Sequence, residues 1–330
     1  MPDDVTLNPL ERLSARLADD LTCVDGLIRT RMASENAPRI PEVTAHLVGA
    51  GGKRVRPLLT VAAARLCGYG GADHVKLAAT VEFIHTATLL HDDVVDESAQ
   101  RRGRPTANLL WDNQSSVLVG DYLFARSFQL MVETGSLRVL DILSGAAATI
   151  AEGEVLQLTA ARNLATSEAT YLKVVRGKTA ALFEAACEVG GVLAGAPEAQ
   201  VRALATYGDA LGIAFQLVDD WLDYGGAGDA TGKNLGDDFR EGKLTLPVIR
   251  ALPMADDAER IFWRDAIERG RSEDFARAQA IVTAHGTLEA TRREALAWRD
   301  RARDALGALP DNELRAMMAD LADFVVERAS

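Results

Sequence analysis

Aromatic residues and paired cysteines are both scarce in this sequence of 330 residues. Phe, Trp and Tyr together make up 5% of the chain, whereas hydrophobic residues of all kinds make up 48%. Ala and Leu recur through most of the chain, and both favour α-helices. The three cysteines, Cys23, Cys67 and Cys187, are far apart and form no Cys-x-x-Cys pair. We therefore expect reduced, partly buried thiols and no structural zinc site.

Long apolar runs and basic surfaces are also missing. No stretch of about 18 uncharged apolar residues occurs, which predicts that there is no transmembrane segment. The N-terminus, Met1-Pro2-Asp3-Asp4, lacks the apolar region of a secretory signal. The formal net charge of −12 argues against nucleic-acid binding, although locally basic loops could still hold an anionic substrate. We expect a cytoplasmic protein, and loose association with a membrane surface stays open.

Proline is absent from the stretches between Pro105 and Pro197 and between Pro197 and Pro247, where apolar residues follow helical spacing. This pattern predicts an all-α protein rather than one built on alternating strands. We expect a single domain over residues 1–330, with the sequence motifs in a core at about 50–250 and a C-terminal helical layer at about 251–330. Helices are expected at about 8–33, 40–49, 55–68, 73–97, 115–134, 137–160, 168–195, 198–225, 244–252, 256–270, 273–285, 288–308 and 311–328.

Two acidic clusters provide the clearest chemical signal. Each has the pattern Asp-Asp-x-x-Asp and follows an apolar stretch: residues 92–96 are Asp-Asp-Val-Val-Asp, and residues 219–223 are Asp-Asp-Trp-Leu-Asp. In a helix, the first and last aspartates of each cluster lie about one turn apart on the same face. Carboxylates gathered there repel one another and need cations. Oxygen ligands suit Mg²⁺, which proteins usually share with substrate phosphates. One such cluster could equally be a solvated helix end, but two favour a metal site.

Basic residues accompany these clusters at positions expected to be loops. Arginine and lysine side chains are the usual means of binding diphosphate oxygens. Each of them alone would more often be a solvated surface charge, so their placement near the carboxylates is the informative feature. The residues concerned are Lys53, Arg54, Arg56, Arg101, Arg102, Arg104, Lys178, Lys233 and Lys243.

These segments resemble the motifs of the trans-polyprenyl diphosphate synthases, the farnesyl/geranylgeranyl synthase family. The resemblance covers roughly residues 50–250 in the expected order. The matching segments are Gly52-Lys53-Arg54-Val55-Arg56-Pro57, Leu90-His91-Asp92-Asp93-Val94-Val95-Asp96, Arg101-Arg102-Gly103, Gly177-Lys178-Thr179, Phe215-Gln216-Leu217-Val218-Asp219-Asp220 with Asp223, and Gly232-Lys233-Asn234-Leu235-Gly236-Asp237. The resemblance implies a single large helical bundle of the isoprenoid synthase type around a central active-site cavity. It also implies a homodimer.

The resemblance further implies a role for each matching residue. Asp92, Asp96 and Asp219 would bind Mg²⁺, with Asp93, Asp220 and Asp223 in supporting positions. Arg101, Lys178, Lys233 and Lys243 would hold the allylic diphosphate, of farnesyl or similar length. Lys53, Arg56, His85 and Arg102 would hold isopentenyl diphosphate, and Thr179 and Gln216 would lie beside the reacting allyl group. His85 precedes Asp92 by seven residues, which places both on nearly the same helix face. Without the resemblance, His85 would be interpreted as a hydrogen-bonded core histidine.

Small residues precede the first aspartate. In short-chain members of the family, bulky aromatic residues often lie four or five positions before it, whereas this chain has Thr88 and Ala87 there. Ile84, Ala87, Thr88 and His91 share one helical stripe, so a tunnel for the growing product could continue along the helix. We therefore expect a long product of the octaprenyl or decaprenyl class, such as a precursor of quinone side chains. Phe124 or Phe128 is expected at the tunnel floor. Alternatively, Ala87 merely allows close packing of helices.

Other functions fit the residues less well. Glu82-Phe83-Ile84-His85 is the only Glu-x-x-His match, whereas a di-iron carboxylate bundle needs two. A phosphate-binding loop is disfavoured because Asn234 follows Lys233 and Ala227 occupies the position of the first glycine. A non-catalytic subunit of a prenyl synthase would be expected to have lost aspartates of these clusters. Both clusters are complete in this sequence, so this alternative is disfavoured. Within the enzymes, the alternatives are a short-chain farnesyl or geranylgeranyl synthase and, less favoured, a terpene cyclase or squalene synthase.

Overall fold

Helices account for nearly all of the secondary structure in the computed structural model, which describes residues 7–49, 53–101, 103–225 and 235–327. Within these ranges the only strands are β1 (Gln100–Arg101) and β2 (Arg104–Pro105), which pair as a short antiparallel hairpin. The predicted all-α fold is therefore confirmed.

The chain divides into two compact units. Unit 1 comprises Met1–Ala147, Leu182–Ala205 and Ala308–Leu321, and unit 2 comprises Ala148–Ala181, Thr206–Gly307 and Ala322–Ser330. Each unit is described by itself below. The single domain expected from the sequence stays a prediction.

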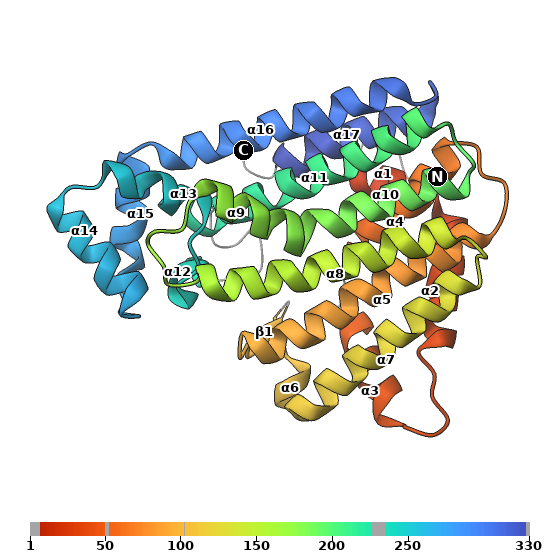
Figure 1. Ribbon diagram of the computed structural model, residues 1–330, viewed down its shortest axis with the longest axis horizontal. Coiled ribbons are helices and arrows are strands. Elements are labelled where there is room, and N and C mark those ends of the chain that lie inside the picture. The colour runs from red at the N-terminus through yellow and green to blue at the C-terminus, as the bar shows by residue number, and fades with distance from the viewer. Residues whose placement is uncertain (1–6, 50–52, 102, 226–234, 328–330) are drawn as a thin grey trace. The chain divides into compact units, whose positions relative to one another are not determined.

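Unit 1 consists mainly of the N-terminal helices (Figure 1). Its complete elements are α1 (Pro9–Arg16), α2 (Ala18–Arg31), α3 (Arg39–Gly49), α4 (Val55–Leu66), α5 (Asp73–Val95), the β1–β2 hairpin, α6 (Ala107–Leu110) and α7 (Asn113–Val132). It also contains most of α10 (Ala181–Leu193) and parts of α8 (Leu137–Ala160), α11 (Glu198–Gly225) and α17 (Glu313–Glu327).

Unit 2 contains the remaining parts of α8, α11 and α17 together with the helices between them. These are α9 (Glu168–Val175), the π-helical turn η1 (Arg176–Ala180), α12 (Asp237–Glu241), α13 (Leu246–Ala251), η2 (Leu252–Met254), α14 (Asp257–Trp263), η3 (Arg264–Glu268), α15 (Phe275–Ala284) and α16 (Thr287–Ala305). The short η4 (Leu306–Ala308) follows α16.

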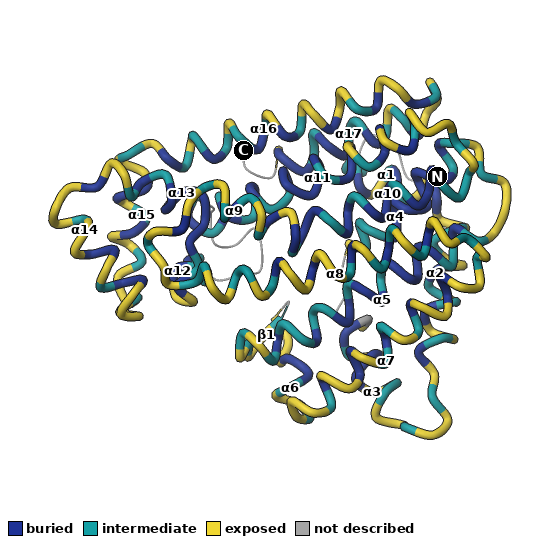
Figure 2. Tube along the Cα trace, viewed as in Figure 1, coloured by how far each residue is buried: buried dark blue, intermediate teal, exposed yellow. Residues whose placement is uncertain are grey.

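The helix α5 lies at the centre of unit 1 and packs against α2, α4 and α7. Its residues are buried on nearly every side, as the dark tube in Figure 2 shows, with Leu77, Val81 and Ile84 fully inaccessible. A helix that is apolar all round belongs in a core. The acidic residues at its C-terminal end therefore follow directly on a helix that is buried along most of its length.

Most of the predicted helices agree with the structure, and the differences are local. The expected helix at 8–33 is two helices, because the backbone leaves helical geometry at Leu17 (φ −112°, ψ 20°). The expected helix at 168–195 contains the η1 turn. The segment between the expected helices at 73–97 and 115–134 carries the hairpin and α6, and the segment between those at 198–225 and 244–252 contains α12. The expected helix at 256–270 contains the π-helical turn η3. These differences depend on local backbone geometry, which apolar periodicity does not report.

No helix in the described part of the chain has both the length and the apolar character needed to cross a bilayer.

The close packing of α10 on α4 gives a test of the unit 1 core. A Cβ atom at Gly190 would lie 2.7 Å from the Ala63 Cβ and 2.9 Å from the Thr60 carbonyl oxygen. We expect Gly190→Ala to lower the free energy of unfolding by about 1–3 kcal/mol, because two helix backbones must separate. Urea denaturation measures the change. The matched control is Gly26→Ala on α2, where nothing lies within 4 Å; it should be neutral or stabilising. Equal effects of the two substitutions would contradict the packing.

Candidate active site

The first acidic cluster ends α5, where Asp96 is the C-cap and its N–H donates to the Asp92 carbonyl at 2.8 Å. Asp92 and Asp96 are partly exposed, whereas Asp93 is completely buried. The helix therefore separates the cluster into two accessible carboxylates, one turn apart, and one enclosed carboxylate.

Arg101 holds the enclosed carboxylate. From the β1 strand, its Nε and Nη2 atoms both lie 2.8 Å from the Asp93 Oδ1 atom. The other oxygen, Asp93 Oδ2, is buried and has no hydrogen-bond partner among the described residues. Burial raises the pKa of Asp93, and the Arg101 guanidinium opposes this rise. The contact fastens the hairpin, with Arg101 in it, to the acidic helix end.

Arg56 and His85 are brought together by the packing of α4 on α5. The Arg56 Nη1 atom lies 3.2 Å from the His85 Nε2 atom. The same guanidinium lies over the Phe183 ring of α10, with Cζ 4.5 Å from the ring centroid. Such cation–π stacking orients the guanidinium plane. Two of the residues predicted to hold isopentenyl diphosphate are therefore neighbours, whereas Lys53 is exposed just before α4.

The stripe predicted to limit product length lies on α5. Ala87 is fully buried, and the half-buried Thr88 donates its hydroxyl to the His85 carbonyl at 2.8 Å. One turn further on, His91 stacks on Phe124 of α7, with ring centroids 6.0 Å apart. Phe124 thus contacts a member of the stripe, whereas Phe128 is an exposed side chain.

The second acidic cluster, on α11 in unit 2, divides in the same way as the first. Asp219 is partly exposed, whereas Asp220 is buried, at 2% of its accessible area. The Asp220 carboxylate accepts hydrogen bonds from Tyr171 of α9 and from Gln216, one turn earlier on α11. Burial raises the pKa of Asp220 to about 8, with a further contribution from the negative charge of Asp238.

Asp223 orders the chain that returns to α12. Its Oδ1 atom accepts hydrogen bonds from the backbone N–H groups of Gly236 and Asp237, each at 3.1 Å. Burial, followed by the negative charge of Asp238, raises the pKa of Asp223 to about 7. Asp223 therefore positions the end of the Gly232–Asp237 motif, of which residues 235–237 are described.

Lys178 and Thr179 lie on η1, a π-helical turn, a feature often found at functional sites. A Cβ atom at Gly177 would lie 2.8 Å from the Gly153 Cα, so the two glycines allow η1 and α8 to touch through their backbones. Lys178 forms an ion pair with Glu154 at 2.7 Å, and Thr179 donates to the Gln216 Oε1 atom at 2.9 Å.

Lys243 follows α12, and its Nζ atom lies 2.6 Å from Glu241. The preceding residue is held by the turn that follows α8: the backbone N–H of Arg162, which is in the left-handed region (φ 57°), donates to the Gly242 carbonyl at 3.0 Å.

The structure brings together several of the predicted residues within each unit. In unit 1 these are Asp93 with Arg101 and Arg56 with His85; in unit 2 they are Thr179, Gln216 and Asp220. The predicted site residues Arg102 and Lys233 lie outside the described residues. Sequence reasoning missed Tyr171 and Glu154, because nothing in one sequence distinguishes a buried tyrosine or a paired glutamate from ordinary helix residues.

Carboxylate oxygens are the kind of ligand that a hard divalent cation prefers. Asp92, Asp96 and Asp219 offer carboxylate oxygens and keep part of their surface exposed, while their buried neighbours are held by other side chains. Within the described residues, no group of three or more His, Cys, Asp or Glu side chains is arranged to hold a metal by itself. Proteins commonly bind Mg²⁺ with one or two carboxylates together with substrate phosphates.

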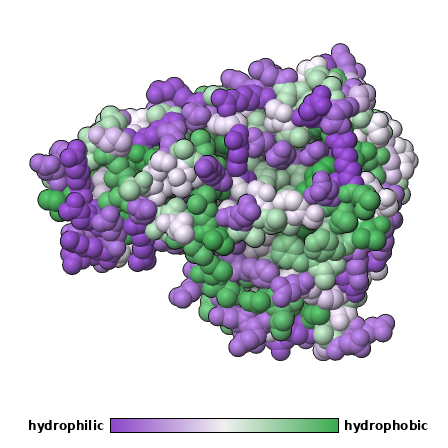
Figure 3. Space-filling model, in the orientation of Figure 1, coloured by the Kyte–Doolittle hydropathy of each residue, from purple (hydrophilic) through white to green (hydrophobic). Residues whose placement is uncertain are grey.

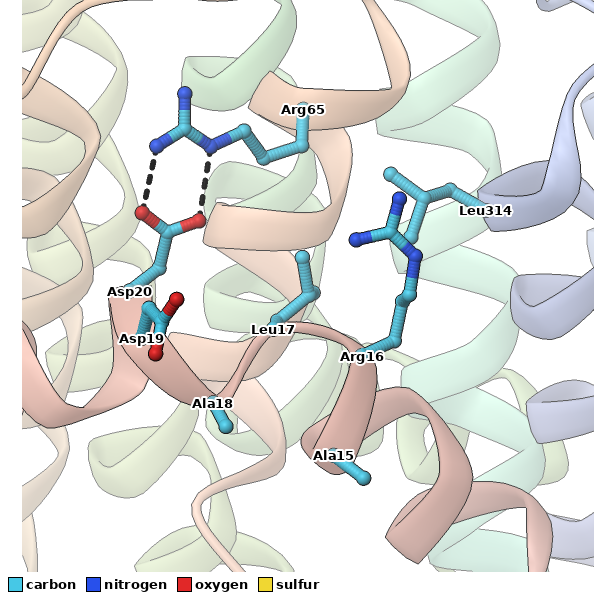
Figure 4. Close-up of a pocket in the computed structure, with 8 residues that line it drawn as sticks. All are labelled: Ala15, Arg16, Leu17, Ala18, Asp19, Asp20, Arg65 and Leu314. Atoms are coloured by element: carbon cyan, nitrogen blue, oxygen red, sulfur yellow. Dashed lines mark hydrogen bonds and ion pairs between the residues drawn. The ribbon is translucent and has the colours of Figure 1, made fainter. Parts of the chain in front are cut away.

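A cavity of about 410 Å³ lies elsewhere in unit 1, where α1 meets α2. Figure 4 shows its lining, in which Arg65 of α4 forms two hydrogen bonds to Asp20, at 2.6 and 2.8 Å. None of the predicted site residues lines it. The ion pair is a structural contact at the junction of α1, α2 and α4.

Comparison with known proteins gives a consistent result. The polyprenyl synthetase family model matches residues 37–284. The crystal structure of a decaprenyl diphosphate synthase from Rhodobacter capsulatus is 69% identical, with a TM-score of 0.94, over 97% of this chain and 99% of that chain. A polyprenyl synthase from Caulobacter crescentus CB15, crystallised with calcium and isoprenyl diphosphate, is 51% identical, with a TM-score of 0.93, over 97% of this chain and 98% of that chain. Octaprenyl diphosphate synthase of Escherichia coli (strain K12) is 45% identical over 97% of this chain and 99% of its own length.

The all-α fold, the two acidic motifs and these matches define a transferase of isoprenoid biosynthesis. The chain belongs to the polyprenyl synthetase family and is a prenyltransferase. The family acts on isoprenyl diphosphates and depends on divalent metal ions.

The Asp20 contact predicts a pH-dependent contribution to stability. The hydrogen bond from Arg65 lowers the pKa of Asp20, burial opposes this, and His74 adds to the lowering. A lowered folded-state pKa stabilises the protein above the unfolded-state value, about 3.9, and the stabilisation disappears as pH falls through the folded-state pKa. We expect Asp20→Asn to lower the free energy of unfolding by roughly 1–3 kcal/mol at neutral pH. The difference should shrink below about pH 4. Urea denaturation across this range, with Asp19→Asn as the exposed control, checks both points; a pH-independent difference would contradict them.

Proposed function

We propose that this prenyltransferase is a long-chain trans-polyprenyl diphosphate synthase. It would use Mg²⁺ to condense isopentenyl diphosphate, head to tail, onto an allylic diphosphate such as farnesyl diphosphate. The observation that carries the proposal is similarity over 97% of the chain to proteins that make decaprenyl and octaprenyl diphosphates. The product would be of octaprenyl or decaprenyl length, as a ubiquinone or other quinone side chain requires.

We assign the metal ligands to the accessible carboxylates, Asp92, Asp96 and Asp219. Bound Mg²⁺ would stabilise the negative charge of the diphosphate leaving group. Asp93, Asp220 and Asp223 support these ligands, since each is engaged by protein groups: Arg101, Tyr171 with Gln216, and the backbone of Gly236 and Asp237, respectively.

The basic residues bind the two diphosphates. Arg101, Lys178, Lys233 and Lys243 are assigned to the allylic substrate, and Lys53, Arg56, His85 and Arg102 to isopentenyl diphosphate. Several of these cations already face carboxylates or an imidazole: Lys178 with Glu154, Lys243 with Glu241 and Arg56 with His85. Such contacts hold the cations in place for substrate oxygens to engage.

The reaction breaks the allylic C–O bond and forms a C–C bond to the isopentenyl double bond. A proton then leaves the adduct and is taken up by the released diphosphate. Thr179 and Gln216 place hydroxyl and amide oxygens beside the allyl group, where positive charge develops. Water must be kept out because it would quench that charge.

Ala87 supports a long product. It is fully buried on α5, five residues before Asp92, where a large side chain would obstruct a tunnel along the helix. A short-chain synthase remains the alternative, followed by a terpene cyclase or squalene synthase. The length and class of the products distinguish all of these.

A homodimer is supported by an apolar strip on α6 and α7. Leu109 and Leu110 of α6 and Leu118 and Val132 of α7 are each between 47% and 66% exposed. Hydrophobic surface gathers over these helices in Figure 3. Leu118, Ala125 and Val132 recur every seven residues, the spacing of helices that pair with other helices. We propose that a second copy of the chain covers this strip. We also propose that the dimer is cytoplasmic and loosely attached to the membranes that receive its product.

The metal assignment predicts the effect of removing one ligand. Asp92→Ala or Asp219→Ala should reduce kcat by at least about 100-fold with the fold retained, because each removes transition-state stabilisation rather than core volume. Incorporation of labelled isopentenyl diphosphate at saturating Mg²⁺ measures the loss, and circular dichroism monitors the fold. Asp304→Ala, an exposed aspartate on α16, is the control and should be as active as wild type. Near-normal turnover of either ligand variant would refute the assignment.

The tunnel argument predicts the effect of filling it. Ala87→Tyr should shift the products towards farnesyl or geranylgeranyl length and leave total isopentenyl incorporation largely unchanged. If no tunnel runs there, the added ring would overpack a buried site and lower stability by about 1–3 kcal/mol or more. Chromatography of the dephosphorylated products and thermal unfolding distinguish the two results. Ala280→Tyr, at an exposed position on α15, should leave the product ladder as in wild type.

The dimer proposal predicts a change in mass. Leu118→Asp combined with Val132→Asp should convert a species with twice the mass of one chain into a monomer, because buried carboxylates would oppose association. Sedimentation velocity measures the mass. The control is Ile261→Asp on α14, a similarly exposed apolar residue in unit 2. The proposal fails if the wild-type protein is monomeric or if the double variant remains dimeric.

A further inference from the structure

Tyr171 is a buried tyrosine to which the reaction scheme assigns no role. It lies on α9 with 5% of its surface exposed, and its hydroxyl donates to the Asp220 Oδ2 atom at 2.5 Å. Asp220 is itself 2% exposed. A hydroxyl committed to a carboxylate away from water is a strong, directional contact, so Tyr171 limits how the Asp220 side chain can turn.

The contact begins a chain of three hydrogen bonds within unit 2. The Gln216 Nε2 atom donates to the Asp220 Oδ1 atom at 2.9 Å, and the Thr179 hydroxyl donates to the Gln216 Oε1 atom, also at 2.9 Å. Each oxygen of Asp220 thus accepts one hydrogen bond. The amide nitrogen of Gln216 therefore faces Asp220, and its amide oxygen faces Thr179.

The order of donors and acceptors has a chemical consequence at Thr179, the last member of this series of hydrogen bonds. Thr179 uses its one hydroxyl proton on Gln216, so the lone pairs of its oxygen point elsewhere. If Tyr171 did not donate, the Asp220 Oδ2 atom would be buried without a partner, at a cost that favours rotation of the carboxyl group away from its contact with Gln216. Without the contact to Asp220, the Gln216 amide would no longer be held with its oxygen towards Thr179.

We propose that Tyr171 is a positioning residue that acts through Asp220 to fix the polarity of Gln216 and Thr179. The fixed arrangement presents oxygen lone pairs, rather than N–H and O–H donors, to the allylic group as its C–O bond breaks. This inference rests on the proposed function, since it assigns Gln216 and Thr179 to the reacting group. It makes Asp220 a part of the same positioning chain rather than a metal ligand.

The test compares steady-state kinetics of Tyr171→Phe, Asp220→Leu and the double variant with wild type. Tyr171→Phe keeps the ring and removes only the donor, so kcat should fall about tenfold, while the KM values for both diphosphates change by less than about twofold. In the Asp220→Leu background the same substitution should change kcat by less than about twofold, because its target is gone. The control is Tyr224→Phe in α11, a fully buried tyrosine whose hydroxyl neighbours Thr245 and makes no hydrogen bond to Asp220; its kcat should equal that of wild type.

Unfolding midpoints of the same proteins test the contact without catalysis. Tyr171→Phe and Asp220→Leu should each lower the midpoint, and the double variant should lose less than the sum of the two shifts, since neither partner of the Tyr171–Asp220 hydrogen bond is then left without the other. A merely structural tyrosine would lower the midpoint but leave kcat of the folded protein unchanged, and that result overturns the inference. Additive effects on kcat, or additive midpoint shifts, overturn it as well.

If Tyr171→Phe does not fold, the kinetics of Asp220→Leu alone decide the question. A wild-type kcat in Asp220→Leu contradicts the proposal. A wild-type protein that incorporates no isopentenyl diphosphate refutes the proposed function instead, and the midpoint cycle still tests the hydrogen-bond chain.

Discussion

The structure of each candidate site follows from the cost of placing carboxylates at the end of an apolar helix. At both acidic motifs one aspartate is buried and its carboxyl oxygens are met by specific donors: Arg101 for Asp93 and Tyr171 with Gln216 for Asp220. An unpaired buried carboxyl group would cost about 1–3 kcal/mol or more, so these donors determine the local arrangement of the hairpin, α9 and η1. The first aspartate of each motif keeps partial exposure and is left for a cation and its substrate.

Small residues provide the second constraint, because they decide how closely helices approach. Gly153 and Gly177 let α8 and η1 meet through their backbones, and this contact carries Lys178 and Thr179. Ala87 combines small size with complete burial directly before the first acidic motif. The scarcity of aromatic residues noted in the sequence therefore has a structural meaning: tight helix packing is achieved with alanine and glycine, and the volume left by Ala87 is the proposed route for a long apolar product.

The all-α class, most helix positions and the two acidic motifs could be predicted from sequence, because apolar periodicity and motif spacing both report on helices. The break at Leu17 and the η1 turn could not, since they alter the backbone without interrupting the apolar pattern. Side-chain partners were also beyond sequence: Arg101 was assigned to the allylic diphosphate, and its contact with Asp93 became visible only once the hairpin was placed. Tyr171 has no motif of its own, and only its burial against Asp220 identifies it.

The central claim is that this prenyltransferase builds a long trans-polyprenyl chain, and its product distribution is the most direct test. Wild-type protein would be incubated with farnesyl diphosphate, labelled isopentenyl diphosphate and Mg²⁺, and the dephosphorylated products separated by chromatography. The account predicts label in alcohols of octaprenyl to decaprenyl length, with none formed when the metal is chelated. Products that stop at farnesyl or geranylgeranyl length, a cyclic hydrocarbon, or no incorporation at all would contradict it.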